Sequence, residues 1–273
     1  MIIPNNVNNS PINRVIKNYG SFLSQHYPDH CIKFTDRLTS DSDAAKFEAV
    51  MYSLMENHFG YKVEIAESTS SGGADFIFSN SNFQFVLEAT HIETETVSQI
   101  SNIEHAKYGK CSYYSYLTHK LRSVASKKAN QLSDYDMPRI LSIGTFHSGG
   151  SDVLEAQGTE LLLHSELKFS VQIDEPIDSA EITDTTDLND SVFFRIENGI
   201  VEPCRQSISA ILLVPVLYDC LYVRGILHPE PKYVFNANAL PDVPFCKVKH
   251  WPVKDSVSIE WINAQKDPDT INL

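Results

Sequence analysis

Two acidic residues stand where consecutive strands would bring them together. Asp75 follows the small turn Gly72-Gly73 and begins a run of strand-forming residues, and Glu88 lies near the end of the next such run, 83–90. Side chains alternate between the two faces of a strand. If these runs pair antiparallel, the two carboxylates meet at one end of the sheet. Converging carboxylates bind hard divalent cations through oxygen, and Mg²⁺ suits such a partly hydrated site.

A third carboxylate, Glu48, lies on an apolar helix face. At 100° per residue, one broad helix face gathers Phe47, Val50, Met51, Leu54, Met55, His58 and Phe59, and Glu48 falls inside that arc. A buried carboxylate is costly unless a hydrogen-bonding or positive group meets it. Glu48 is therefore bonded to local backbone and Tyr groups, or it belongs to a charged site.

A lysine and a glutamine come from the helix expected at 113–132. Lys128 points along the middle of its apolar face and Gln131 lies at the edge. Between His105 and Ser133 there are six basic residues and no acid. A positively charged surface beside carboxylates is what phosphodiester hydrolysis needs, since the cations attract the nucleic-acid backbone and the carboxylates hold a metal ion.

Each of these residues also has a plainer interpretation. An Asp directly after a turn is often only a turn residue, which applies to Asp75. Lys128 could extend its ammonium to solvent along the helix surface. His91, just beyond the second strand, could act as a general base, although a histidine there is often a surface residue.

The elements that must position these side chains predict a mixed α/β fold. A helix is expected from the Ser40–Asp43 cluster to Phe59, where helix-capping residues begin it. Strands follow at 61–66, 74–78 and 83–90, then the helix at 113–132 and a strand at 139–146. In the second half of the chain, the sequence predicts a helix at 153–167 and strands at 168–173, 191–196 and 208–216. It also predicts a turn at Asn198-Gly199.

Composition restricts the class of protein. The chain has 273 residues, of which 42% are hydrophobic, and a net charge of −13. These values are typical of a globular protein and exclude a general polyanion binder. The five cysteines form no CxxC pair, which argues against a zinc ribbon or a disulfide scaffold. We find no signal peptide and no membrane span, so we expect a cytoplasmic protein. The acidic segment 174–190 is expected to be a solvated loop or, alternatively, a docking surface for a basic partner.

The motifs resemble those of a nuclease superfamily. A helix with an inward Glu48, then Gly-Gly-Ala-Asp-Phe at 72–76, then Val-Leu-Glu-Ala-Thr at 86–90, then a helix with Lys-x-x-Gln, is similar to the restriction-endonuclease-like, PD-(D/E)xK proteins. The similarity covers residues 41–146. It implies a restriction-endonuclease-like core, a mixed central sheet flanked by helices, here followed by a C-terminal β-rich extension. We expect an N-terminal segment at 1–40, the core at 41–150 and the extension at 151–273.

The resemblance implies roles for individual residues. Asp75, Glu88 and the Ala89 carbonyl would hold Mg²⁺ or Mn²⁺, and Glu48 would orient a ligand or bind the metal through water. The usual lysine two residues after the strand acid is replaced by Thr90, and Lys128 would supply that cation from the following helix. Gln131 would hold a phosphate oxygen. The residues expected to bind nucleic acid are Lys120, Arg122 and Lys127.

Three functions remain open. The first is a metal-dependent nuclease that hydrolyses DNA, with RNA as a possible substrate, in restriction or anti-phage defence. The second is a catalytically inactive nuclease-fold subunit that binds nucleic acid, a protein partner or a second copy of itself. The third is an unrelated α/β protein whose acidic loop docks a partner. Thr90 favours the second, and the set of Glu48, Asp75, Glu88 and Lys128 favours the first.

Overall fold

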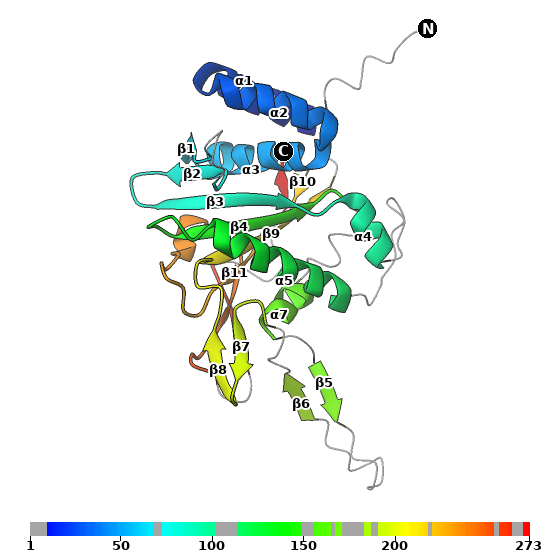
Figure 1. Ribbon diagram of the computed structural model, residues 1–273, viewed down its shortest axis with the longest axis vertical. Helices are drawn as coiled ribbons and strands as arrows, with labels where there is room; N and C mark the ends of the chain where they lie inside the picture. Colours follow the sequence, from blue (N-terminus) through cyan, green and yellow to red (C-terminus); the bar gives the residue numbers. More distant parts are fainter. Residues whose placement is uncertain are drawn as a thin grey trace.

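A ten-stranded mixed sheet forms the centre of the computed structural model (Figure 1). The structure describes residues 10–67, 73–101, 114–148, 156–164, 167–170, 183–186, 191–217, 220–253, 257–263 and 270–273. The main path of the sheet runs in the order β1 (Lys62–Ile65), β2 (Phe76–Ser79), β3 (Gln84–His91), β4 (Arg139–Thr145), β9 (Ala210–Leu217), β11 (Arg224–Leu227), β12 (Phe245–Val248) and β13 (Ile259–Ile262). The short strands β10 (Cys220–Leu221) and β14 (Ile271–Asn272) pair beside β9.

The middle of the sheet is parallel and buried. β1, β2 and β3 pair antiparallel, whereas β3, β4 and β9 are parallel neighbours. Every residue of β4 is buried, and so is β9 up to its last residue. Parallel strands covered by helices on both faces are largely apolar, and the buried polar residues of β4 are Arg139, Ser142 and Thr145. Because β9 pairs directly with β4, the sheet continues without a break across residue 150, where we expected the core to give way to the extension.

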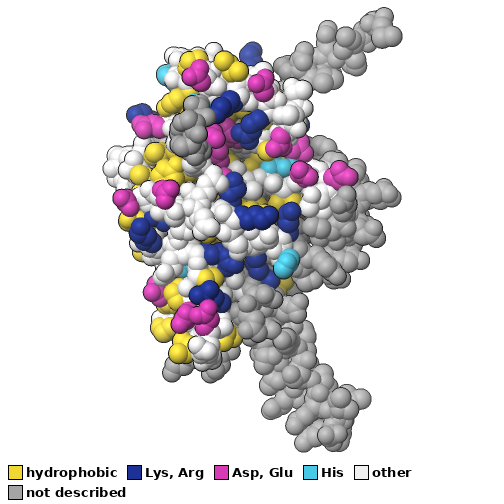
Figure 2. All heavy atoms as spheres, in the orientation of Figure 1, with side chains coloured by type: hydrophobic (Ala, Val, Ile, Leu, Met, Phe, Trp, Pro, Cys, Tyr) yellow, Lys and Arg dark blue, Asp and Glu magenta, His cyan; other side chains and the backbone are white. Residues whose placement is uncertain are grey.

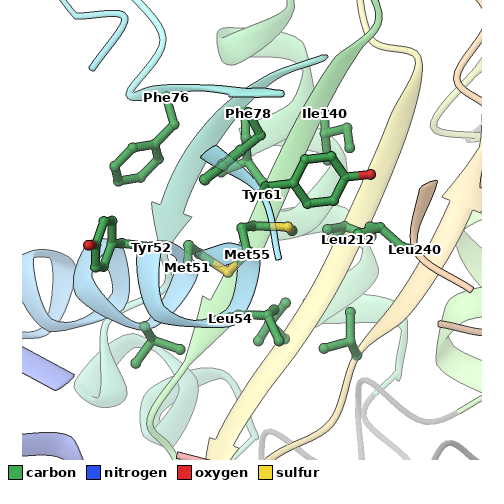
Figure 3. Packing of buried hydrophobic residues seen from close by; sticks show 14 of the residues in the cluster. Met51, Tyr52, Leu54, Met55, Tyr61, Phe76, Phe78, Ile140, Leu212 and Leu240 are labelled. Atoms are coloured by element: carbon green, nitrogen blue, oxygen red, sulfur yellow. The ribbon is translucent and has the colours of Figure 1, made fainter. Parts of the chain in front are cut away.

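One face of the sheet carries the N-terminal helices. These are α1 (Pro11–His26), α2 (Pro28–Ser40) and α3 (Ser42–Ser53), the last prolonged by a π-helical turn at Leu54–His58. Met51 and Met55 point from this helix toward the sheet, where Phe78 and Leu212 lie (Figure 3). The packing is so close that a Cβ on Gly144 of β4 would stand 2.1 Å from the Phe47 ring. Glycine is therefore required at that position of β4.

The helices α1 and α2 correct our expectation that the first helix follows residue 40. Ser10 caps α1, its Oγ accepting a hydrogen bond from the Asn13 amide at 3.4 Å, and Pro11 opens the helix. The residues that α1 buries, Val15, Tyr19 and Leu23, recur every four positions, which is a helical period. The signal was therefore present in the sequence.

The opposite face carries α4 (Thr94–Ser101), α5 (Tyr114–Gln131) and α7 (Ala156–Leu163), which lie across the sheet from α3 (Figure 1). Two hairpins extend from this side: β5 (Leu167–Ser170) with β6 (Thr183–Thr186), and β7 (Phe194–Glu197) with β8 (Ile200–Pro203). The expected turn at Asn198-Gly199 is confirmed, with φ angles of 52° and 77°. Such positive values match the two-residue turns that suit the strand twist.

The coarse prediction of a mixed α/β protein with a central sheet between helices is confirmed. The predicted helices and strands occur, shifted by a few residues at their ends. One detail of the first helix was wrong: His58 is exposed rather than on the apolar face, because the wider π-helical turn changes the phase of the helix.

Most of the acidic segment 174–190 lies outside the described residues. The four cysteines within the described ranges are free, in agreement with the absence of a disulfide framework. Among the helices that the structure describes, none has the length and apolar character needed to cross a membrane.

Candidate active site

The pairing of β2 with β3 brings Asp75 and Glu88 next to each other at one end of the strand pair. In this antiparallel pair Ile77 lies opposite Val86, and both pack into the core on the α5 side. Moving two residues along each strand leads to Asp75, just before β2, and to Glu88. Glu88 shares the α5 face with Val86, whereas Asp75 precedes β2 at a bend, where the charges of both Glu88 and Glu48 act on it.

The Asp75 carboxylate bonds the backbone of β3 just beyond the point where β2 begins. Its Oδ2 accepts a hydrogen bond from the Ala89 amide at 2.7 Å, and this is its only hydrogen bond within the described part of the chain. Burial raises the pKa of the Asp75 carboxyl well above its usual range, and the negative charges of Glu88 and then Glu48 raise it further. Asp75 therefore has one carboxylate oxygen without a hydrogen bond from a described residue. Its surroundings favour the protonated, neutral form of the carboxyl group.

Glu88 is held by two side chains of α5. Its Oε1 accepts a hydrogen bond from Lys128 Nζ at 2.6 Å, and its Oε2 accepts one from Gln131 Nε2 at 3.1 Å. Lys128 also donates to Gln131 Oε1 at 3.0 Å, so the three groups form a closed network. Burial raises the pKa of Glu88, and the ammonium of Lys128 opposes this shift. The helix-wheel prediction that Lys128 faces the acidic residues is confirmed.

Gln131 also fixes the turn that leads into Asp75. Its Nε2 donates to the carbonyl of Gly73, while the Ala74 amide donates to the hydroxyl of Tyr135 at 2.9 Å. Gly73 has a φ of +141°, and a Cβ there would lie 2.7 Å from the same hydroxyl. Gly73 thus meets a conformational and a steric requirement at once, and the turn is tied to α5 and to the loop that follows it.

Glu48 lies on α3 and is bonded to the N-terminal helices. Its Oε1 accepts from the Tyr19 hydroxyl at 2.6 Å, and its Oε2 accepts from Arg37 Nη1, also at 2.6 Å. Burial raises the pKa of Glu48, while the positive charge of Arg37 lowers it. Both alternatives foreseen for Glu48 hold in part: it bonds a tyrosine and an arginine, and its charge acts on Asp75.

Tyr19 and Arg37 are site residues that the sequence analysis missed. They come from α1 and α2, helices that we did not expect. The only available signal for Tyr19 was its place between Val15 and Leu23 on the apolar stripe. For Arg37, whose side chain is 39% exposed, no local pattern distinguishes it from an ordinary surface arginine.

His91 lies away from Glu88. Its ring is 6.4 Å from the Phe47 ring and 5.5 Å from the Phe146 ring, measured between centroids, so it packs toward α3. Burial lowers its pKa. Alternation along β3 also puts His91 and Glu88 on opposite faces, which does not suit the role of general base that we considered for His91.

The oxygen donors at this end of the sheet suit a hard divalent cation. Asp75 has one oxygen without a protein hydrogen bond among the described residues, and Glu88 lies beside it at the end of the β2–β3 pair. Burial and the negative charge of Glu88 oppose the ionisation of Asp75, so the Asp75 carboxylate gains from a bound cation. The described residues contain no group of three or more His, Cys, Asp or Glu placed to hold a metal ion. A cation here would therefore need water or backbone oxygens, such as the Ala89 carbonyl, to complete its ligands.

The three residues expected to bind nucleic acid all lie on α5 but differ in their surroundings. Lys127 is exposed and Lys120 is half-buried. Arg122 is half-buried and donates from Nη2 to the Leu161 carbonyl at 3.0 Å, so it also joins α5 to α7.

Comparisons with known protein families, with curated proteins and with solved structures found no match to this chain.

Proposed function

We propose that the chain is a metal-dependent nuclease of the restriction-endonuclease-like kind, which hydrolyses phosphodiester bonds of DNA. The observation that carries this proposal is that Asp75 and Glu88 lie next to each other at the end of the β2–β3 pair, with Lys128 Nζ 2.6 Å from Glu88. Two oxygen donors beside a cation are the groups that phosphodiester hydrolysis requires. The sequence resemblance over residues 41–146 supports the same assignment.

Asp75, Glu88 and the Ala89 carbonyl would hold Mg²⁺ or Mn²⁺. When bound, the ion supplies positive charge that polarises the phosphate and activates a water. The chain's own residues have separate tasks. Lys128 stabilises the negative charge that grows on the phosphate oxygens during attack. Gln131 positions Lys128 and Glu88 through its two hydrogen bonds and holds the Gly73 turn.

Glu48 sets the electrostatic environment of Asp75 from the α3 side. Tyr19 and Arg37 keep it in place and offset the cost of its burial. Lys120, Arg122 and Lys127 provide positive surface for the DNA backbone in a chain whose net charge is −13. A role in restriction or anti-phage defence follows from the family resemblance, and a protein partner or homodimer would fit the same setting.

A plasmid-nicking assay tests this function. The full chain should cut supercoiled DNA with Mg²⁺ or Mn²⁺ and should stop cutting in EDTA. The variants Asp75→Asn and Glu88→Gln should be inactive while keeping the wild-type circular dichroism spectrum. The same assay on RNA separates the two nucleic acids. Cleavage that persists in EDTA would refute the mechanism.

A second candidate is an inactive subunit that keeps the fold and binds nucleic acid or protein. It is favoured by Thr90, which stands at the position where the family usually has its lysine. It is also favoured by the fact that both oxygens of Glu88 are already bonded to α5. A wild-type chain that binds DNA but never cuts DNA or RNA with either metal would support this candidate.

A further inference from the structure

A pocket of about 730 Å³ lies beside α5, away from Glu88. We call it the α5 pocket. Its walls come from three parts of the chain that are far apart in sequence: α5, the start of the β7–β8 hairpin, and the segment between β8 and β9. The described residues lining it include Arg122, Lys127, Arg195 and Arg205. Its volume is within the range of natural small-molecule sites.

The pocket is on a different face of α5 from the candidate active site. Ser123, Ser126, Lys127 and Asn130 line it and recur at helical spacing, so they share one face. Lys128, which contacts Glu88, lies about 150° around the helix from the middle of that face. One helix therefore presents the two sites on separate faces.

The charge of the α5 pocket is positive. None of its described lining residues is acidic, and His119 adds a further titratable group at the rim. Arg195 does pair with Glu197 at 3.1 Å, but both side chains are about half exposed, and such surface pairs contribute little. Figure 2 shows Lys and Arg side chains gathered on the face along which α5 runs in Figure 1. The pocket therefore selects for an anion.

Arg205 fixes one wall of the pocket and leaves its charge uncompensated there. Its guanidinium donates to Ser126 Oγ at 2.8 and 2.6 Å and to the Val192 carbonyl at 2.7 Å. These acceptors are neutral, and Arg205 has no ion pair with any residue in the described ranges. Since Ser126 Oγ accepts both bonds, its own hydrogen remains available to donate into the pocket. Arginine forks and hydroxyl donors are the groups that recognise phosphate oxygens.

We propose that the α5 pocket is a phosphate-binding site, separate from the Asp75–Glu88 site. The phosphate belongs either to a nucleic-acid backbone or to a free nucleotide, which share this chemistry. The nucleic-acid form rests on the proposed function, because it would make the pocket a second anchor for the nuclease substrate. The free-nucleotide form is independent of it.

Binding measurements on the full chain test the proposal. All binding measurements are made in the Asp75→Asn background and in EDTA, so that the DNA duplex is not cut. The probes are a short fluorescein-labelled DNA duplex, followed by anisotropy across a series of salt concentrations, and AMP, followed by calorimetry. The test variants are Arg195→Ala and Lys127→Ala. The control is Lys62→Ala, because Lys62 pairs with Glu64 two residues along its strand, just as Arg195 pairs with Glu197.

If the source is nucleic acid, each test variant should bind the duplex about tenfold more weakly, and its salt slope should fall by about one. Lys62→Ala should remain within about twofold of the background protein. If the source is a free nucleotide, both test variants should lose AMP binding, and Arg195→Ala should bind the duplex as the control does. The proposal is overturned if the test variants bind both probes as well as Lys62→Ala does, or if the background protein binds neither.

The two proposals fail in different experiments. Pocket-dependent duplex binding by a wild-type chain that never cuts would sink the nuclease function and leave the pocket standing. Metal-dependent cutting, with duplex and AMP binding that do not depend on Arg195, would support the nuclease function and overturn the pocket proposal. Thermal melting of each variant shows whether a loss of binding reflects unfolding.

Discussion

Lys128 Nζ lies 2.6 Å from Glu88 Oε1, and this contact joins α5 to the central strand β3. Glu88 is 2% exposed, whereas the Lys128 side chain is 30% exposed. The carboxylate is thus fixed in the interior, while the ammonium reaches the surface at the same end of the sheet as Asp75. The ammonium of Lys128 is therefore held by Glu88 and Gln131 and is still partly open to solvent.

Replacing Lys128 should separate catalysis from binding. If the proposed nuclease mechanism holds, Lys128→Ala removes the charge that would stabilise the transition state and leaves Glu88 buried without its cation, so the cleavage rate should fall at least ~100-fold, or about 2.7 kcal/mol. Lys127→Ala, one residue earlier and exposed, should mainly weaken DNA binding and its salt dependence. Single-turnover rates at saturating enzyme measure the first effect. Normal cutting by Lys128→Ala would show that this lysine does not act at the phosphate.

Asp75→Asn should stabilise the protein at alkaline pH. The folded-state pKa of Asp75 is raised, so the folded state holds the proton more strongly than the unfolded state does. The free energy of unfolding therefore decreases as the pH rises from the usual pKa range of a carboxyl group toward the raised pKa that Asp75 has in the folded state. Asn is neutral at every pH and can still accept the bond from Ala89. Melting in EDTA at pH 8 should give a midpoint about 2–4 °C higher for the variant, which corresponds to about 1 kcal/mol. A lower midpoint at pH 8, with wild-type behaviour at pH 5, would contradict the stated origin of the shift.

Divalent cations should stabilise the folded chain through the same carboxylate. At a Mg²⁺ concentration about 100 times the dissociation constant, binding to the folded state adds about 2.7 kcal/mol. The wild type should therefore melt later with Mg²⁺ or Mn²⁺, and Asp75→Asn should not respond. Asp43→Asn is the control, because Asp43 is an acid of the same length that pairs with Lys46 outside the site. Equal responses in all three proteins would place the cation elsewhere.

The bonds to Glu48 should be worth more than ordinary surface contacts. Arg37→Ala leaves a buried carboxylate with only one partner, Tyr19, so it should cost about 1–3 kcal/mol of unfolding free energy. Tyr19→Phe removes one hydrogen bond and should cost about 1 kcal/mol. Urea denaturation measures both, with the exposed Lys62→Ala as reference. Because the positive charge of Arg37 lowers the pKa of Glu48, the cost of Arg37→Ala should shrink in acid, where Glu48 is protonated. A loss that does not change with pH would argue against a charge effect.

Gly73→Ala should disturb the turn before Asp75 through Tyr135. The new Cβ would lie 2.7 Å from the Tyr135 hydroxyl at a φ of +141°, and a cost of about 1–3 kcal/mol is expected. Gly199→Ala is the control: its φ is +77°, but nothing lies within 4 Å of the added Cβ. In a Tyr135→Phe background, which lacks the hydroxyl, the cost of Gly73→Ala should fall toward that of Gly199→Ala. An unchanged cost would assign the whole effect to the backbone.

Local periodicity was enough to predict much of the candidate site. Alternation along 83–90 put Glu88 and Val86 on one strand face, and the 100° helical step put Lys128 on the inward face of its helix. Both follow from the geometry of a single element, which a few consecutive residues determine. The same local rule failed at His58, where one wider turn changed the phase of the helix.

Only the tertiary structure decided which elements meet. The register that sets Phe76 opposite Leu87, and so Asp75 beside Glu88, is a contact between strands. Tyr19 and Arg37 reach Glu48 from helices 29 and 11 residues earlier. Arg205 reaches Ser126 across 79 residues of chain. Such contacts depend on how strands and helices close on each other across long loops, and no residue pattern within one element carries that information.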